Sequence, residues 1–492
     1  MVMVLMACLA TALCQASHNY AAQSVLRQGS WTKIKVRDNG LYKLTYEQIQ
    51  QMGHDPATVR IYGYGGAMLN ELFTDPYTDD LPEVNVMVYT GGDNTFGPGD
   101  YLVFYAQGPT SWRYGKIANY ANNLFTHTTN CYATYGCYFV TSGGTPARVT
   151  TANVETPTSS TVITSFTDYQ VHELDSINFI SSGREFYGEE LNSSRMSRNF
   201  SFSTPYLEGE LATLRLSAAA RGTSSTVLTV AQSNGSVVGS LSISARNTSS
   251  TYEYARVNSE VWTFTPTLGN VLPLTVTSNN SSSNAWIDFI EVNLTRQLTM
   301  NNRPLYFRDV NHLGQGETHQ FQIQGATAET KVWDITRPDR AFELPCQFFN
   351  GTLTFAASTD TLREFVAFNP SNIQQQVEVV GNVANQNLHD LPATDYVIIT
   401  HHDFLAEAER LANAHRSEMS VEVVDAEQVY NEFSSGTPDA TAYRRFMKMF
   451  YDRYHQALIS GDSATMANCR EPRYLLLWGD GNYDNLSIDR QY

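Results

Sequence analysis

The C-terminal part of the chain alternates between short apolar runs and longer stretches of helical periodicity. Three runs have the length and composition of buried strands: residues 396–400, 421–424 and 474–478. The stretches with helical periodicity cover residues 404–416 and about 440–455. This alternation predicts an α/β domain over residues 395–492, with a parallel sheet whose chemistry gathers beyond the carboxyl ends of its strands. Three strands are few for a sheet that must be covered on both faces, so we expect this domain to be incomplete.

The first part of the chain, residues 24–150, is predicted to be mostly β with one short helix. Residues 31–36 alternate between apolar and polar side chains, as in a half-buried strand. Asp38-Asn39-Gly40 has the composition of a tight turn. We therefore expect residues 41–44 to return as the partner strand of a hairpin.

The middle of the chain consists of short alternating runs separated by turn residues. Residues 168–301 have the rhythm of an antiparallel β-sandwich domain, and residues 305–380 form a further β region. Residues 151–162 are rich in Thr and Ser and are predicted to be a linker or an exposed loop. Such sandwiches bind carbohydrate or hold other domains together. No clear tryptophan platform is visible in the sequence, so a scaffold role is favoured.

The N-terminus is predicted to be a signal peptide covering residues 1–16. Its apolar run is too short to span a bilayer, and small residues follow at the expected cleavage site. The signal is atypical because no Lys or Arg precedes Arg27. No second apolar run of membrane length exists, so we expect an exported protein that is soluble or held by partners.

Length, composition and net charge limit the number of domains and the kinds of partner. The chain has 492 residues, a length that suggests roughly three domains of about 150 residues each. Hydrophobic residues make up 42%, which is sufficient for sizeable cores. The net charge is −17 and no polybasic patch is present, which argues against nucleic acid as a partner.

The cysteines offer one possible disulfide and no visible nucleophile. Cys131 and Cys137 flank a plausible turn and are a possible disulfide in an oxidising compartment, although two small apolar strand residues would give the same pattern. Cys346 and Cys469 stand alone, and burial explains both. No Gly-x-Ser-x-Gly turn, His-Glu-x-x-His helix or Cys beside a catalytic-type His is present.

Polar residues follow each predicted strand of the α/β domain. His401 and His402 come directly after the first strand, Asp425 ends the second and Asp480 follows the third. Together they could form a metal or acid–base cluster at the sheet edge. The alternative, which the sequence favours, is that Asp403 caps a helix and the histidines lie in a loop.

A calcium loop is the other metal hypothesis, and it is weak. Asp480, Asn482 and Asp484 have the one-three-five spacing of oxygen ligands. Asn485 then stands where an EF-hand requires Gly, and Gln491 stands where it requires Glu. The sequence therefore predicts no metal site and no cofactor beyond a weak possibility of Ca²⁺.

Several separate segments resemble one peptidase family. The strand at 396–400, its following helix and the Arg-Tyr-Leu-Leu-Leu-Trp-Gly-Asp-Gly-Asn-Tyr-Asp stretch at 473–484 resemble the opening of a gingipain-family cysteine peptidase domain. Upstream segments resemble the sortases of the type IX secretion system within that family: residues 40–44, 60–63, 99–109 and 182–189. The resemblance spans nearly the whole chain.

The resemblance implies a caspase-like fold in which a Cys thiolate attacks a peptide carbonyl and a His moves the proton. It implies an enzyme that removes the C-terminal sorting signals of secreted cargo and promotes cargo attachment to the surface. Its partners would be that cargo and other type IX components at the outer membrane of a Gram-negative bacterium. The expected location is the cell surface or the outer membrane.

The catalytic residues of the family do not map onto this sequence. The family's Cys and His lie downstream of the Gly-Asp-Gly strand end, so we expect both beyond Tyr492 and expect the chain as given to be inactive. Gly479, Asp480 and Gly481 map to a loop beside the eventual site. The alternative is an exported, non-enzymatic β-sandwich protein that binds or scaffolds.

Overall fold

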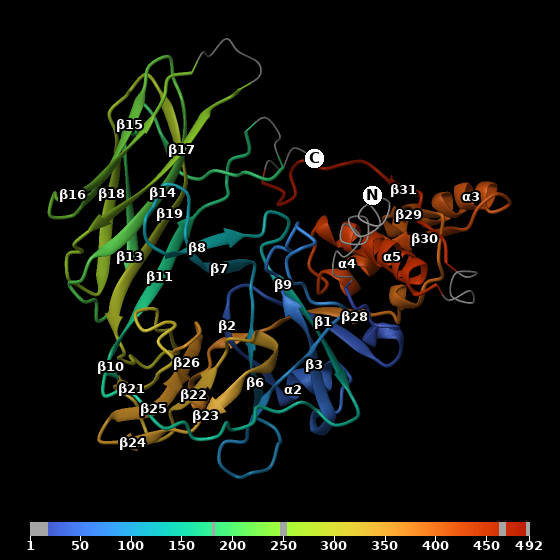
Figure 1. Cartoon of the computed structure of the whole chain (residues 1–492), viewed down its shortest axis with the longest axis horizontal. Helices are drawn as coiled ribbons and strands as arrows, with labels where there is room; N and C mark the ends of the chain where they lie inside the picture. Colours follow the sequence, from blue (N-terminus) through green and yellow to red (C-terminus); the bar gives the residue numbers. More distant parts are fainter. Residues whose placement is uncertain (1–17, 180–182, 247–252, 462–468, 489–492) are drawn as a thin grey trace, which may run out of the picture. The chain divides into compact units, whose positions relative to one another are not determined.

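The computed structural model describes residues 18–179, 183–246, 253–461 and 469–488. The predicted signal peptide at residues 1–16 lies outside this range. The chain groups into two compact units. Unit 1 comprises residues 18–110, 132–147 and 375–481, and unit 2 comprises residues 111–131, 148–374 and 482–488. The β-rich start and the α/β end predicted from the sequence are both present (Figure 1).

Unit 1 begins with two β-sheets. The first has the order β28-β1-β9-β3-β4, formed by Glu378–Val383, Trp31–Val36, Gly136–Ser142, Val59–Gly65 and Glu83–Val84. The second has the order β27-β2-β6-β5, formed by Gln375–Gln376, Gly40–Thr45, Tyr101–Ala106 and Met87–Tyr89. Apolar side chains from both sheets form one core, which includes Ile34, Leu44, Ile61, Phe104 and Val140. The short helix α2 (Tyr46–Gln51) begins with a Thr45–Gln48 capping box.

The hairpin predicted for residues 31–44 is wrong. The turn residues are where the sequence placed them, but β1 pairs with β9 and β28, whereas β2 pairs with β6 and β27. The two strands therefore belong to different sheets. Both strands contribute side chains to the same buried core. The turn therefore connects two sheets that pack on that core instead of closing a hairpin within one sheet. The partner β28 lies far along the chain, which a local pattern cannot indicate.

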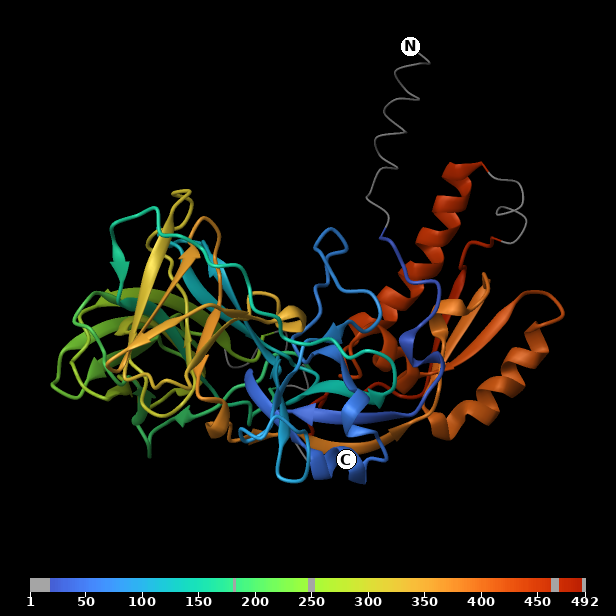
Figure 2. The same ribbon diagram turned by 90° about the horizontal axis from the view of Figure 1, so that it is seen from below.

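The α/β part of unit 1 contains a three-stranded parallel sheet. Its order is β30-β29-β31, formed by Val421–Asp425, Tyr396–Thr400 and Tyr474–Trp478. Three α-helices accompany it: α3 (Leu405–His415), α4 (Ala426–Phe433) and α5 (Thr441–Ser460). α4 and α5 pack on one face of the sheet and α3 packs on the other, as Figures 1 and 2 show. The alternation predicted from the sequence is confirmed, with α4 as an additional helix.

α4 packs firmly although it is short. Asp425 caps it by accepting a hydrogen bond from the Glu427 amide at 2.9 Å. Val429 and Phe433, one turn apart, point into the core beside α5. The Asp425 cap and the Val429–Phe433 spacing are visible in the sequence, but α4 lies between a predicted strand and a longer predicted helix and was not predicted.

A buried cluster of charges joins the α/β part of unit 1 to its first residues. The His389 ring is fully buried and stacks on Phe433 at 4.7 Å. Its Nδ1 lies 2.5 Å from a Glu432 oxygen and its Nε2 lies 3.2 Å from an Asp79 oxygen. Glu432 also accepts the backbone amides of Leu388 and His389. Burial alone would lower the pKa of His389, but the two carboxylates raise that pKa to about 9.

The loop between α4 and α5 makes a second connection inside unit 1. Ser435 Oγ accepts the Tyr64 amide at 2.9 Å and donates to the Cys137 carbonyl at 3.0 Å. Thr437 Oγ1 accepts the Cys137 amide and donates to the Gly65 carbonyl. The loop thus satisfies backbone groups of β3 and β9 that would otherwise be buried without partners.

Unit 2 contains the predicted antiparallel sandwich. One sheet has the order β11-β19-β14-β17, formed by Ser165–Glu173, Asn284–Gln297, Ala212–Arg221 and Arg256–Phe264, with β12 (Glu190–Leu191) also paired to β19. The other has the order β13-β18-β15-β16, formed by Ser197–Ser203, Val271–Ser278, Thr226–Gln232 and Val237–Ile243. Alternate side chains of both sheets fill a continuous apolar core.

A smaller pair of sheets completes unit 2. One has the order β10-β21-β25-β24, formed by Val162–Ile163, Thr318–Gln324, Thr352–Ser358 and Gln347–Phe349. The other has the order β20-β26-β22-β23, formed by Leu305–Phe307, Phe365–Phe368, Lys331–Asp334 and Phe342–Leu344. Four phenylalanines at the centre of their shared core are Phe307, Phe321, Phe355 and Phe365. Two features differ from the predicted boundaries: β10 comes from the end of the Thr- and Ser-rich segment, and β28 starts inside the predicted 305–380 region but joins a sheet of unit 1.

The hairpin β7–β8 (Thr110–Gly115 and Leu124–Thr129) is fixed to the sandwich by a second buried histidine. His127 lies between the carboxylates of Glu173 on β11 and Glu291 on β19. Burial alone would lower its pKa, but these carboxylates raise that pKa to about 9. Asn293 adds two hydrogen bonds to the backbone of Phe125. Residues 111–131 therefore group with the sandwich, although the sequence places them inside the predicted 24–150 region.

None of the helices in the described residues is long and apolar enough to cross a membrane.

We predict that His389→Gln weakens the packing of α4 strongly. The substitution leaves Glu432 and Asp79 buried without their cation, a loss that costs about 3–5 kcal/mol in comparable buried pairs. Hydrogen exchange of the α4 amides measures the effect, and their protection should fall accordingly. Arg37→Ala is the control, because the Arg37–Glu378 pair is exposed and should contribute less than about 1 kcal/mol. Equal effects of the two substitutions would contradict the prediction.

The same cluster predicts a pH dependence of stability. The folded pKa of His389, about 9, lies above the ordinary value of 6.5, so the folded state binds the proton more tightly. The resulting stabilisation, about 3 kcal/mol, is complete below pH 6.5 and is lost as the pH rises to about 9. Urea midpoints of the wild type and His389→Gln should converge over this range. His127 titrates in the same window in both proteins, so only the difference between them is diagnostic.

Candidate functional site

The candidate residues from the sequence gather at the carboxyl edge of the parallel sheet in unit 1. β29 ends at Thr400 and is followed by His401. β30 ends at Asp425, and β31 is followed by Gly479. Thr400 Oγ1 donates to the Trp478 carbonyl at 3.1 Å and so ties two strand ends together. The edge is where parallel α/β sheets place ligands and catalytic groups.

His401, His402 and Asp403 form a compact exposed group at this edge. The two imidazole centroids lie 3.9 Å apart. His401 Nδ1 lies 3.4 Å from one Asp403 oxygen, and His402 Nε2 lies 3.2 Å from the other. Among the described residues, these three bring donor atoms of metal-binding type within 4.8 Å of one another. The sequence analysis singled out the two histidines. The run of three consecutive potential donors directly after a strand could have indicated that Asp403 belongs to the same group.

The capping roles at this edge differ in part from the prediction. Asp403 was expected to be a helix cap, but the His401 side chain takes that position and accepts the Asp403 amide at 3.3 Å. Asp425 caps α4 and is not part of the His401–Asp403 group. The wider cluster of His401, His402, Asp425 and Asp480 is therefore not formed as one donor set.

The Gly479–Asp480–Gly481 loop is exposed, and the Asp480 side chain bonds to its backbone. Gly479 has a positive φ of 144°, which a side chain at this position would strain. Asp480 Oδ1 accepts the Gly481 amide at 2.8 Å. The role of this loop beside a catalytic site remains a prediction from the resemblance.

Asn482 and Asp484 act as local turn formers within unit 2. Asn482 Oδ1 accepts the Asp484 amide at 2.8 Å, and Asp484 Oδ1 accepts the Ile488 amide at 2.7 Å. Asn485 Nδ2 donates to the Gly183 carbonyl at 2.6 Å. Side-chain oxygens that already accept backbone amides are explained without a calcium ion.

Two of the cysteines, Cys137 and Cys346, do not resemble activated nucleophiles. Cys137 is buried, and burial raises the pKa of its thiol. Burial also raises the pKa of the Cys346 thiol, to about 12. Cys131 and Cys137 are not joined by a disulfide in the structure. A raised thiol pKa opposes thiolate formation, so neither Cys137 nor Cys346 is set up for attack on a carbonyl.

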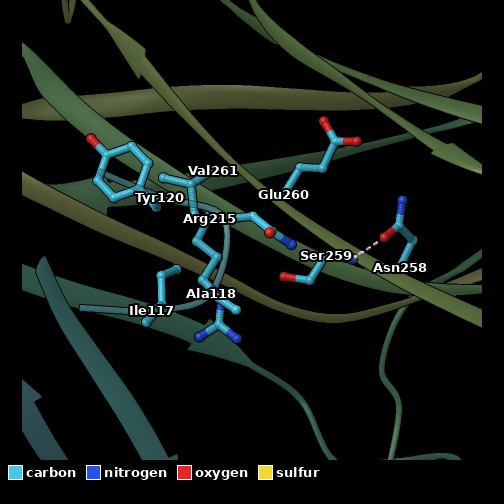
Figure 3. A pocket seen from close by; sticks show the side chains of 9 residues that line it. Ile117, Ala118, Tyr120, Arg215, Asn258, Ser259, Glu260 and Val261 are labelled. Atoms are coloured by element: carbon cyan, nitrogen blue, oxygen red, sulfur yellow. Dashed lines mark hydrogen bonds between the residues drawn. The ribbon is translucent and has the colours of Figure 1, made fainter. Parts of the chain in front are cut away.

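Unit 2 contains a hollow on the outer face of the sandwich, between the loop after β7 and strands β14 and β17 (Figure 3). Its volume is about 520 Å³. Arg215 in its wall donates to Glu291 at 3.2 Å, and Asn258 donates to the Ser242 carbonyl and accepts the Ser259 amide. Its best-placed polar groups are therefore engaged within the protein. The hollow does not present a converging set of ligand groups.

Comparison with solved structures identifies the relationship. The crystal structure of dimeric latent PorU from Porphyromonas gingivalis matches with a TM-score of 0.80 at 30% identity. The match covers 95% of this chain and 43% of the PorU chain, so the chain spans less than half the length of PorU. Residues 389–489 match peptidase family C25. This chain is PorU-like and carries a C25 segment. The gingipain-type resemblance inferred from the sequence is confirmed.

The C25 segment of this PorU-like chain begins at His389, the residue at the centre of the buried charge cluster. No curated protein sequence matches the chain significantly. Two carbohydrate-binding modules also match in structure: a CBM36 bound to calcium and xylotriose, and the CBM6 of LamC from Zobellia galactanivorans. The CBM36 has 15% identity and a TM-score of 0.17, with 26% of this chain and 99% of the module covered. The CBM6 has 11% identity and a TM-score of 0.15, with 21% and 97% covered. TM-scores this low carry no argument about the PorU-like chain.

We predict that Asp425→Ala destabilises α4 by about 1 kcal/mol, because the helix loses its N-cap. Hydrogen exchange of the α4 amides would measure the change. Asp425→Asn is the matched control, since Asn caps helices about as well as Asp. Unchanged exchange in Asp425→Ala would show that the Asp425 cap does not stabilise α4.

Proposed function

We propose that the chain is the N-terminal part of a gingipain-like cysteine endopeptidase that works as a sortase. The whole protein would remove C-terminal sorting signals from cargo of the type IX secretion system and promote attachment of that cargo to the cell surface. The observation that carries this proposal is the match to latent PorU over 95% of the chain. The C25 match at residues 389–489 adds the cysteine peptidase chemistry.

Strand β31 supports a peptidase domain that continues beyond it. In the sheet of the described residues, β31 is an edge strand paired only with β29. Its side chains Tyr474, Leu475 and Leu477 are 54%, 44% and 56% exposed. Strands of parallel sheets are normally buried on both faces, and a long apolar edge invites a further strand. We propose that the next strand of the whole protein pairs there.

The catalytic Cys and His are proposed to lie beyond Tyr492, as the family resemblance implies. The raised thiol pKa of Cys137 and of Cys346 argues against either as the nucleophile. The 492 residues would then supply the start of the peptidase sheet and the β-rich units upstream of it. We infer that they lack peptidase activity alone.

The proposed location is the cell surface or the outer membrane after export. The proposed partners are secreted cargo with C-terminal sorting signals and other type IX components. Self-association is a further proposal, because the PorU structure is dimeric and latent. These proposals rest on the relationship to PorU.

The activity test uses the purified chain and a peptide that ends in a sorting signal. We expect no cleavage above the buffer rate, because the proposal places the catalytic Cys and His beyond Tyr492 and burial raises the thiol pKa of Cys137 and Cys346. Thiol-sensitive cleavage that a Cys469→Ala or Cys137→Ala variant abolishes would contradict the proposed inactivity.

The encoding DNA beyond codon 492 tests the other half of the proposal. We expect the frame to continue with a strand ending in a His loop and a strand ending in Cys, and the longer protein to cleave the same peptide. A stop codon directly after Tyr492 would instead favour the non-enzymatic scaffold.

A further inference from the structure

His401, His402 and Asp403 form a compact group of side chains to which the cysteine peptidase mechanism assigns no role. The backbone explains how consecutive residues come to face one another. His401 still has extended dihedrals, φ −72° and ψ 149°, and the chain then tightens into the 3₁₀ turn η6 (His402–Phe404). In a continuing strand, neighbouring side chains would point to opposite faces. The change of conformation brings two imidazoles and a carboxylate together.

Two separations between donor atoms in this group are close to those found around a small metal ion. A tetrahedral Zn²⁺ holds His nitrogen and carboxylate oxygen at about 2.0–2.2 Å, which places two such ligands roughly 3.3–3.5 Å apart. His402 Nε2 and His401 Nδ1 lie 3.2 Å and 3.4 Å from the two Asp403 oxygens. All three donors lie within 4.8 Å of one another. Closing the set requires side-chain rotations, and binding through His401 Nδ1 replaces the 3.3 Å hydrogen bond that this atom accepts from the Asp403 amide.

We propose that His401, His402 and Asp403 bind one divalent transition-metal ion of the Zn²⁺ class. Two imidazoles and one carboxylate are a donor set that suits Zn²⁺, Co²⁺, Ni²⁺ or Cu²⁺, whereas Ca²⁺ and Mg²⁺ prefer all-oxygen sites. Three protein ligands leave at least one position for water.

The surroundings of the group permit entry of an ion from solvent. The side chains of His401, His402 and Asp403 are 55%, 59% and 68% exposed. The Phe404 ring, from the following turn, has its centroid 6.4 Å from that of His401. An exposed ion pair would contribute less than about 1 kcal/mol, so ion pairing alone is a weak reason for this arrangement. The proposal is independent of whether the chain belongs to an active peptidase.

The test is calorimetric titration of the full chain, purified without a polyhistidine tag, with ZnCl₂. We expect saturable binding of one ion per chain. His402→Ala and Asp403→Asn should each weaken binding by about tenfold or more, and the double variant His401→Ala/His402→Ala should bind no ion at this site. Co²⁺ provides a second readout, because ligation by these residues changes its visible absorption.

His415→Ala is the matched control. His415 lies in the same α/β segment, packs its ring against Tyr396 at 5.9 Å and has no ion pair among the described residues. This variant should bind Zn²⁺ as the wild type does, and circular dichroism confirms that every variant is folded. Absence of saturable Zn²⁺ binding, unchanged binding by the double variant, or a preference for Ca²⁺ over Zn²⁺ would each overturn the proposal.

Discussion

The buried ion cluster around His389 links the start of the α/β segment of unit 1 to the first part of the chain. A single imidazolium lies between two carboxylates, Glu432 from α4 and Asp79 from the first part of the chain. Charges removed from water are tolerated only when their partners and hydrogen bonds are complete. Here the backbone amides of Leu388 and Ala21 and the side chain of Gln386 supply the remaining hydrogen bonds. The cluster therefore specifies one arrangement of three segments that are distant in the sequence.

The rest of unit 1 extends that constraint toward the sheet edge. β27 and β28 enter the two N-terminal sheets just before the cluster, so the chain reaches His389 from a fixed direction. The loop between α4 and α5 then bonds to the backbone of β3 and β9 through Ser435 and Thr437. The parallel sheet is thus supported at its start and again between its second and third strands. The carboxyl edge, with His401 and Gly479, is left exposed.

Most strands and helices could be predicted from the sequence, but the pairing of strands that are distant in the chain could not. The strands of the α/β segment were predictable because parallel strands buried on both faces are continuous apolar runs. The partnership of β1 with β28 was not, because strand pairing across most of the chain leaves no local pattern. α4 was missed although its cap Asp425 and its apolar residues were visible, since a helix this short gives few periodic positions. At the site, the sequence located the edge, but only coordinates show that His401 and His402 converge on Asp403 and that Asp425 serves α4.

The titratable side chains of the described residues fall into two groups: some are buried, and others are exposed at the edge of the parallel sheet. Cys137 and Cys346 have their thiols held in the protonated form by burial, and the two buried histidines have their protons held by carboxylates. None of these four groups is poised to exchange protons with a substrate near neutral pH. The groups that solvent can reach near the carboxyl ends of the strands include the two imidazoles of His401 and His402 and the carboxylates of Asp403 and Asp480, and the outer strand β31 exposes apolar side chains. Under the proposed function, a further strand of the whole protein would pair beside β31, which is where a parallel sheet continues, and would bring the nucleophile to this edge.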